Sequence, residues 1–180
     1  MPADKYSAIE ILRDGARIEI RALTPDDEAD LVAAIERTSS ESMRRRFFVV
    51  KRTFTDQETA FFLNVDFVNH VALVAVVEEG GPSVIAGGGR YIVVRPGEAE
   101  VAFAVVDEYQ GRGVGGALMR HLTAIARAAG LKRFIAEVLG ENLPMLRIFE
   151  KSGLQMSTKR ESGVAYVTLQ LSAYPTETKS

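Results

Sequence analysis

Apolar positions along the chain follow two different periods. Three short runs are apolar at nearly every position, are separated by turns rich in Gly and Pro, and span residues 70–78, 83–94 and 98–106. Such runs are typical of strands whose two faces are both covered, and we expect helices on each face. Residues 9–23 instead alternate on both sides of Asp14-Gly15, which predicts a β-hairpin.

Helical spacing of apolar residues appears in two longer segments. The first opens at Thr24, and the second covers residues 113–129 and ends at Gly130. The remaining pattern predicts a strand, a helix and a final strand at residues 133–139, 142–152 and 164–171.

This order of elements predicts one α/β domain. We place it at residues 16–171, with residues 1–15 as an N-terminal arm or hairpin and residues 172–180 as a frayed tail. Residues 39–63 predict further short helices and contain the cluster RRRFF at 44–48. Two interpretations of this cluster stay open: a solvated basic face beside two buried rings, or a site that attracts an acidic cofactor or protein.

Composition removes several classes of function. The 180 residues carry a formal net charge of −2, whereas nucleic-acid-binding domains are usually basic, so we predict no nucleic-acid partner. The chain has no cysteine, and His70 and His121 are not at metal-binding spacing, so we predict no metal. It has neither an apolar run of roughly 18 residues nor a secretory signal. We therefore expect a cytoplasmic protein without a membrane partner.

Four glycines stand between the strand at 98–106 and the helix at 113–129, at positions Gly111, Gly113, Gly115 and Gly116. The first N–H groups of a helix have no internal partner and carry a partial positive charge. Without side chains in the way, a phosphate or pyrophosphate can reach them, and Arg112 adds a charge. The cluster therefore predicts a phosphate cradle.

Two familiar phosphate loops fit these glycines poorly. The nucleoside-triphosphate loop needs Gly-Lys-Ser/Thr, and here the chain reads Gly116-Ala117-Leu118. The spacing Gly-x-Gly-x-x-Gly is met, but the dinucleotide motif belongs to the first strand-turn-helix unit of a parallel sheet. Here the glycines follow an antiparallel-looking meander, so that pattern is weak.

The longer motif Gln110-Gly111-Arg112-Gly113-Val114-Gly115 resembles the Gln/Arg-x-x-Gly-x-Gly/Ala loop of the GNAT superfamily of N-acetyltransferases. The strand at 100–106 is similar to that family's fourth strand, and GENLPMLRIFEKSGL at 140–154 is similar to its Asn-containing segment. The segments SSESMRRRFF and ENLPML look like the catalytic domain of bacterial protein-lysine acetyltransferases that modify acyl-CoA synthetases. The resemblance covers nearly the whole chain.

The resemblance implies a mixed, mostly antiparallel sheet of about seven strands, flanked by helices and splayed between the fourth and fifth strands. It implies acetyl-CoA as co-substrate, with its pyrophosphate on residues 110–116, namely Gln110, Gly111, Arg112, Gly113, Val114, Gly115 and Gly116. The pantetheine arm would pair with the backbone of Ala104, Val105 and Val106 and contact Asn142, which is also a good helix N-cap.

The resemblance further implies that Glu100 is the general base for a primary amine, with Glu98 as the reserve. Many relatives carry a tyrosine acid where this chain has Phe149, which cannot donate a proton. Tyr91, Tyr109 and Tyr166 are other hydroxyl donors, and the sequence does not choose among them.

Three functions stay open. The first is acetylation of a protein lysine, with an acyl-CoA synthetase as one possible acceptor. The second is acetylation of a small amine. The third is a non-catalytic sensor that binds acyl-CoA through the same loop.

Overall fold

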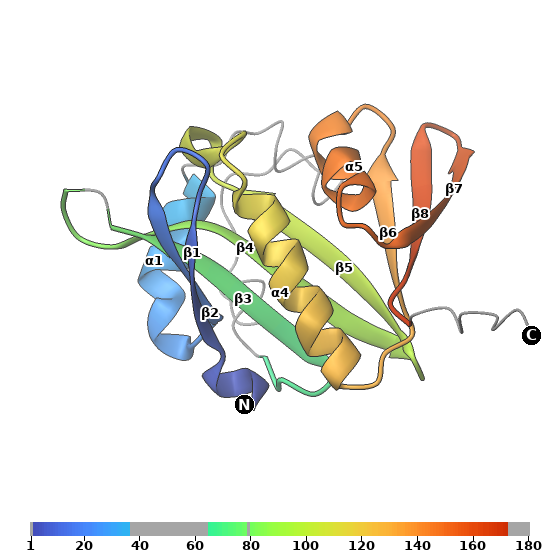
Figure 1. The fold of residues 1–180 in the computed structure, drawn as a ribbon, viewed down its shortest axis with the longest axis horizontal. Coiled ribbons are helices and arrows are strands. Elements are labelled where there is room, and N and C mark those ends of the chain that lie inside the picture. The colour runs from blue at the N-terminus through green and yellow to red at the C-terminus, as the bar shows by residue number, and fades with distance from the viewer. Residues whose placement is uncertain (1, 37–64, 79, 173–180) are drawn as a thin grey trace, which may run out of the picture.

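The computed structural model of the protein describes residues 2–36, 65–78 and 80–172 (Figure 1). The predicted helices at 39–63, the RRRFF cluster and nearly all of the predicted tail lie outside the described residues.

Eight strands form one sheet with the order β1-β2-β3-β4-β5-β6-β8-β7. Every neighbouring pair is antiparallel except β5 and β6, which are parallel. The strands are β1 (Ser7–Ile11), β2 (Arg17–Ala22), β3 (His70–Val77), β4 (Val84–Arg95), β5 (Glu98–Val105), β6 (Arg133–Leu139), β7 (Gln155–Glu161) and β8 (Val164–Gln170). The mixed, mostly antiparallel GNAT-like sheet is therefore confirmed, with eight strands rather than about seven.

The splay predicted between the fourth and fifth strands of the family's sheet lies between β5 and β6, because the strand that resembles the family's fourth is β5 here. The two strands pair only from Glu98 to Glu100 on β5, opposite Arg133 to Ile135 on β6. On its other side β5 stays paired with β4 as far as Val105. The second half of β5 therefore has an open edge, and this edge leads directly into the glycine loop.

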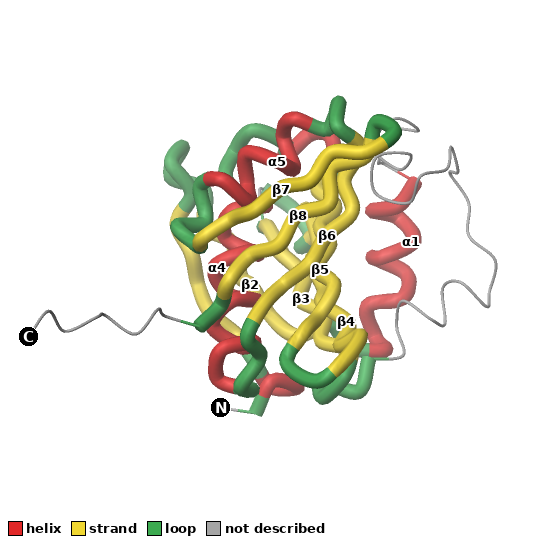
Figure 2. Tube along the Cα trace, turned by 90° about the vertical axis from the view of Figure 1, so that its right-hand side faces the viewer, coloured by secondary structure: helices red, strands yellow, loops and turns green. Residues whose placement is uncertain are grey.

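Helices cover both faces of the sheet (Figure 2). One face carries α4 (Val114–Ala128), which packs on β3, β4 and β5, and the other carries α1 (Glu28–Glu36), which packs on β4. A shorter helix, α5 (Leu143–Glu150), lies beside α4. Gly89 on β4 permits close packing on the α4 face, because a Cβ there would lie 2.7 Å from the Phe103 ring.

The strand β7 was not predicted. Its sequence, QMSTKRE, has no apolar alternation and is mostly exposed. It forms as an edge strand because all seven residues pair with β8. Backbone hydrogen bonds to a neighbouring strand, rather than burial of its own side chains, account for this element.

Candidate functional site

The glycine loop ends at the N-terminus of α4. Gly113 is the N-cap residue with φ 94°, a left-handed conformation that favours glycine. The first i→i−4 hydrogen bond of the helix runs from the Ala117 N–H to the Gly113 carbonyl, at 3.1 Å. The N–H groups of Val114, Gly115 and Gly116 thus precede the first internal bond, and no side chain caps them.

The two glycines inside the helix differ in purpose. A Cβ on Gly115 would lie 2.5 Å from Ile148 Cδ1, so glycine there lets α5 approach α4 closely. A Cβ on Gly116 would meet only Arg120, at 3.7 Å. Packing therefore accounts for Gly115, whereas Gly116 borders open space.

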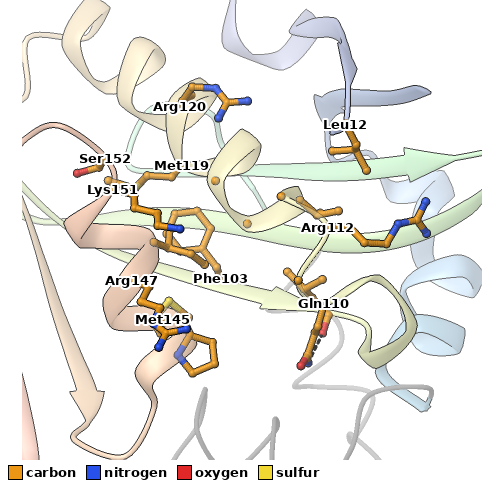
Figure 3. A pocket seen from close by; sticks show the side chains of 18 of the residues that line it. Leu12, Phe103, Gln110, Arg112, Met119, Arg120, Met145, Arg147, Lys151 and Ser152 are labelled. Carbon is orange, nitrogen blue, oxygen red and sulfur yellow. Dashed lines mark hydrogen bonds between the residues drawn. The ribbon is translucent and has the colours of Figure 1, made fainter. Parts of the chain in front are cut away.

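A cleft of about 1090 Å³ opens at this helix end (Figure 3). Its walls come from residues 11–13 at the end of β1, residues 103–105 at the end of β5, the loop and helix start at 109–116, further residues along α4, and α5 with its flanking residues. All the cradle residues predicted from the sequence line this cleft except Val106.

The cleft is strongly cationic although the chain carries a net charge of −2. Among the described residues that line it, six are basic and none is acidic; the six are Arg13, Arg112, Arg120, Arg127, Arg147 and Lys151. Unpaired helix N–H groups, an apolar floor and basic walls suit an elongated ligand that carries several phosphates. These properties fit acetyl-CoA.

Three of the six cations already have partners. The Arg112 Nε donates to Asp14 Oδ2 at 2.7 Å, and its guanidinium lies 5.0 Å from the centre of the Tyr109 ring. Arg120 pairs with Glu10 at 3.2 Å. The Arg127 Nε donates to the carbonyl of Leu171 at 2.8 Å.

The backbone of three residues was predicted to pair with the pantetheine arm at the open edge of β5. In two of them, Ala104 and Val106, the N–H group faces β4 instead. The Val106 N–H donates to the carbonyl of Ala86 at 2.8 Å. Because N–H groups two residues apart in a strand share a side, that of Ala104 also faces β4. The backbone of Val105 faces the open edge, where its carbonyl accepts a hydrogen bond from Gln110 Nε2 at 3.2 Å.

The two candidate carboxylates occupy different environments. Glu98 is 6% exposed and is held by Arg133 at 2.5 Å and by Arg95 at 3.2 Å. Glu100 is exposed, and it makes no hydrogen bond or ion pair with a described residue. By strand alternation both carboxylates lie on the face opposite Phe103, so Glu100 stands outside the cleft lining, on the far side of β5.

Some of the remaining predicted residues line the cleft, and the others lie outside it. Asn142 lines the cleft and caps α5, its Oδ1 accepting from the Met145 N–H at 3.2 Å. Phe149 is fully buried, with its ring centre 6.2 Å from that of Phe103. Among the three tyrosines, only Tyr109 lines the cleft. Tyr91 is buried in the core, which raises its pKa to about 12, and Tyr166 is exposed on β8.

A model of the acetyltransferase (GNAT) family matches residues 34–154. The chain belongs to the GNAT family. The protein that carries this loop, splayed strand and basic cleft is therefore a member of a family of acetyltransferases.

Two relatives show extended similarity. Acetyltransferase Pat of Mycolicibacterium smegmatis is 37% identical over 147 residues, which are 79% of this chain and 42% of that protein. The GNAT domain of S. lividans PAT superimposes with a TM-score of 0.82 at 36% identity, covering 91% of this chain and 96% of that domain. The chain therefore spans less than half the length of the M. smegmatis relative.

A more distant solved structure, yncA from Salmonella typhimurium with its cofactor acetyl-CoA, shares the fold. Its TM-score is 0.70 at 19% identity, covering 87% of this chain and 95% of that one.

The sequence did not predict five of the cleft's six cations, namely Arg13, Arg120, Arg127, Arg147 and Lys151. Helical spacing could have indicated two of them, because residues four apart lie on the same face of a helix. Arg120 lies four residues after Gly116, and Lys151 lies four residues after Arg147. Nothing in the local sequence connects Arg13 with the glycine loop, since about a hundred residues separate them.

Both histidines have structural partners in the fold. The His121 Nε2 on α4 lies 2.7 Å from Glu10 Oε1, and its Nδ1 bonds the Tyr6 hydroxyl. The His70 Nε2 lies 2.8 Å from Arg90 Nη1.

Within the described ranges, no group of three or more His, Cys, Asp or Glu side chains is arranged to hold a metal ion. None of the helices in those ranges is long and apolar enough to cross a membrane.

Proposed function

We propose that this protein transfers an acetyl group from acetyl-CoA to a primary amine, and that the amine is a protein lysine. The observation that carries the proposal is the α4 N-terminus, which opens into a basic cleft beside the free edge of β5. The likeness to Pat proteins favours a protein acceptor over a small amine.

The residues of the cleft would bind and orient the co-substrate. The N–H groups of Val114, Gly115 and Gly116 would hold its pyrophosphate, and the open edge of β5 near Val105 would hold its pantetheine arm. Asn142 can contact that arm through its amide nitrogen, because its Oδ1 already caps α5. When bound, acetyl-CoA supplies a thioester carbonyl that an amine can attack.

Glu100 would act as the general base. A lysine amine, with a pKa of about 10.4, is protonated at neutral pH and must lose a proton before it can attack. The exposed Glu100 carboxylate, without a partner among the described residues, lies where β5 stops pairing with β6, on the face opposite the cleft. It would accept the proton of an amine that reaches the thioester from that face, directly or through a water. Glu98 is a weaker candidate since Arg95 and Arg133 engage it. The new C–N bond forms as the C–S bond breaks, and CoA leaves.

Phe149 is a buried ring and cannot protonate the departing thiolate. Tyr109 is the tyrosine that lines the cleft, so it is our candidate acid. A thiolate is also a fairly good leaving group and can depart without help.

The test is acetyl-CoA-dependent thiol release with an acyl-CoA synthetase and a panel of small amines as acceptors. We expect release with the synthetase, and a loss of about a hundredfold in kcat/KM for Glu100→Gln near neutral pH. The loss should shrink as pH rises, because the amine then deprotonates without a base. Glu161→Gln, an exposed carboxylate on β7, is the matched control and should behave as wild type.

Each contrary result has a distinct meaning. Release with small amines alone would show that the acceptor is a small-molecule amine rather than a protein. Binding of acetyl-CoA without release for any acceptor would favour the sensor function. Equal activity of Glu100→Gln and wild type at every pH would move the base elsewhere.

A further inference from the structure

The β1–β2 hairpin contacts the phosphate loop directly, although the two segments are far apart in the sequence. Leu12 is 7% exposed, and a Cβ on Gly113 would lie 3.9 Å from its Cδ2. Two residues later, Asp14 Oδ2 accepts the bond from Arg112 Nε at 2.7 Å. Figure 3 shows Leu12 and the Arg112 side chain on the same side of the loop, away from Lys151 and Phe103.

The hairpin is also fixed in itself and along α4. The Leu12 N–H donates to the Ala16 carbonyl at 2.8 Å, and the Gly15 N–H donates to the Leu12 carbonyl at 2.9 Å. Farther down β1, Glu10 binds both Arg120 and His121 of α4, at 3.2 and 2.7 Å. The backbone at the tip therefore has a set position relative to the N-terminus of α4.

Two arginines lie where the hairpin meets the glycine loop, and one of them, Arg112, is paired with a carboxylate. The carboxylate of Asp14 offsets the charge of Arg112 and holds its guanidinium toward the hairpin. Arg13, between Leu12 and Asp14, lines the cleft, is exposed, and has no hydrogen bond or ion pair with a described residue. Arg13 thus presents a full positive charge to the cleft beside the helix end.

We propose that Arg13 is a phosphate-binding residue that contacts the pyrophosphate held at the α4 N-terminus. The hairpin then forms part of the co-substrate site, although it lies outside the residues 34–154 that the family model matches. Asp14 and Leu12 are positioning residues, because they fix Arg13 and the loop relative to each other. This inference rests on the proposed function, since it takes acetyl-CoA as the ligand.

The experiment is calorimetric titration of wild type, Arg13→Gln, Arg13→Lys and Arg17→Gln with acetyl-CoA and with 3′-dephospho-acetyl-CoA. Arg17 is the matched control, because it is an exposed arginine of the same hairpin that does not line the cleft. We expect Arg13→Gln to raise Kd about threefold to fivefold for both ligands, as loss of one exposed charge pair implies. The deficit should shrink in high salt, which screens the pair.

Arg13→Lys should retain affinity within about twofold, since it keeps the charge. Equal Kd values for Arg13→Gln and Arg17→Gln, with tight binding by wild type, would overturn the inference and leave the proposed function intact. A deficit limited to the ligand with the 3′-phosphate would overturn the assignment to the pyrophosphate. No binding of either ligand by wild type would refute the proposed function and this inference with it.

Discussion

Asp27 anchors the chain where it leaves β2 for α1. Its two carboxylate oxygens accept from the Arg21 guanidinium at 2.8 and 2.7 Å, and it also accepts the Thr24 N–H at 2.8 Å. Burial by itself raises the pKa of this carboxyl, but these hydrogen bonds outweigh it and hold the pKa below the ordinary value of 3.8.

Replacement of Asp27 by Asn should lower the free energy of unfolding by about 2 kcal/mol at pH 7, because it leaves a half-buried Arg21 without its bidentate partner. A carboxyl whose pKa is depressed in the folded state stabilises the protein above its unfolded pKa. That contribution is lost as the pH falls through the folded value. Urea unfolding of both proteins from pH 7 to pH 3 should therefore show their difference narrowing below about pH 4. A constant difference across that range would contradict the assignment.

At the scale of elements, the start of α4 contains two glycines, Gly113 and Gly116, whose backbone conformations differ. Gly113 must adopt a positive φ to turn the chain into the helix, whereas Gly116 has ordinary helical geometry and open space around it. The backbone conformation therefore requires glycine at Gly113, whereas packing does not require it at Gly116.

Alanine at these two positions should have opposite effects on stability. Gly113→Ala should cost about 1 kcal/mol, since a Cβ is strained at positive φ. Gly116→Ala should add about 0.5–1 kcal/mol, because it replaces glycine inside a helix. Denaturant unfolding of the two variants beside wild type measures this, and equal effects of the same sign would contradict the distinction.

For the whole molecule, the cleft joins β1, β5, α4 and α5, so a ligand bound there contacts elements from both halves of the chain. A ligand that binds only the folded state stabilises it by mass action. Acetyl-CoA at about a hundred times its Kd should add about 2.7 kcal/mol and raise Tm by roughly 5–10 °C. Thermal scans over a series of acetyl-CoA concentrations test this. Adenosine, which lacks the phosphates, should leave Tm nearly unchanged, and an equal rise with adenosine would argue against phosphate binding.

Local sequence was sufficient for most elements and for the loop. The apolar runs at β3, β4 and β5 and the helical stripe of α4 encode their own structure, because each buries its own side chains. The glycines between β5 and α4 likewise indicated a helix start open to an anion. β7 was missed because its stability comes from pairing with β8 rather than from its own side chains.

The sequence by itself determined the order of elements, the glycine loop and the GNAT resemblance, since these depend on residues close together in the chain. Only the tertiary structure decided which backbone groups of Val105 and Val106 remain available, and that Arg13 and Asp14 adjoin the loop. The first depends on pairing with β4, where Ala86 holds the Val106 N–H, and the second on contacts between segments about a hundred residues apart. Sheet pairing and packing create such contacts, and no local pattern of residues records them.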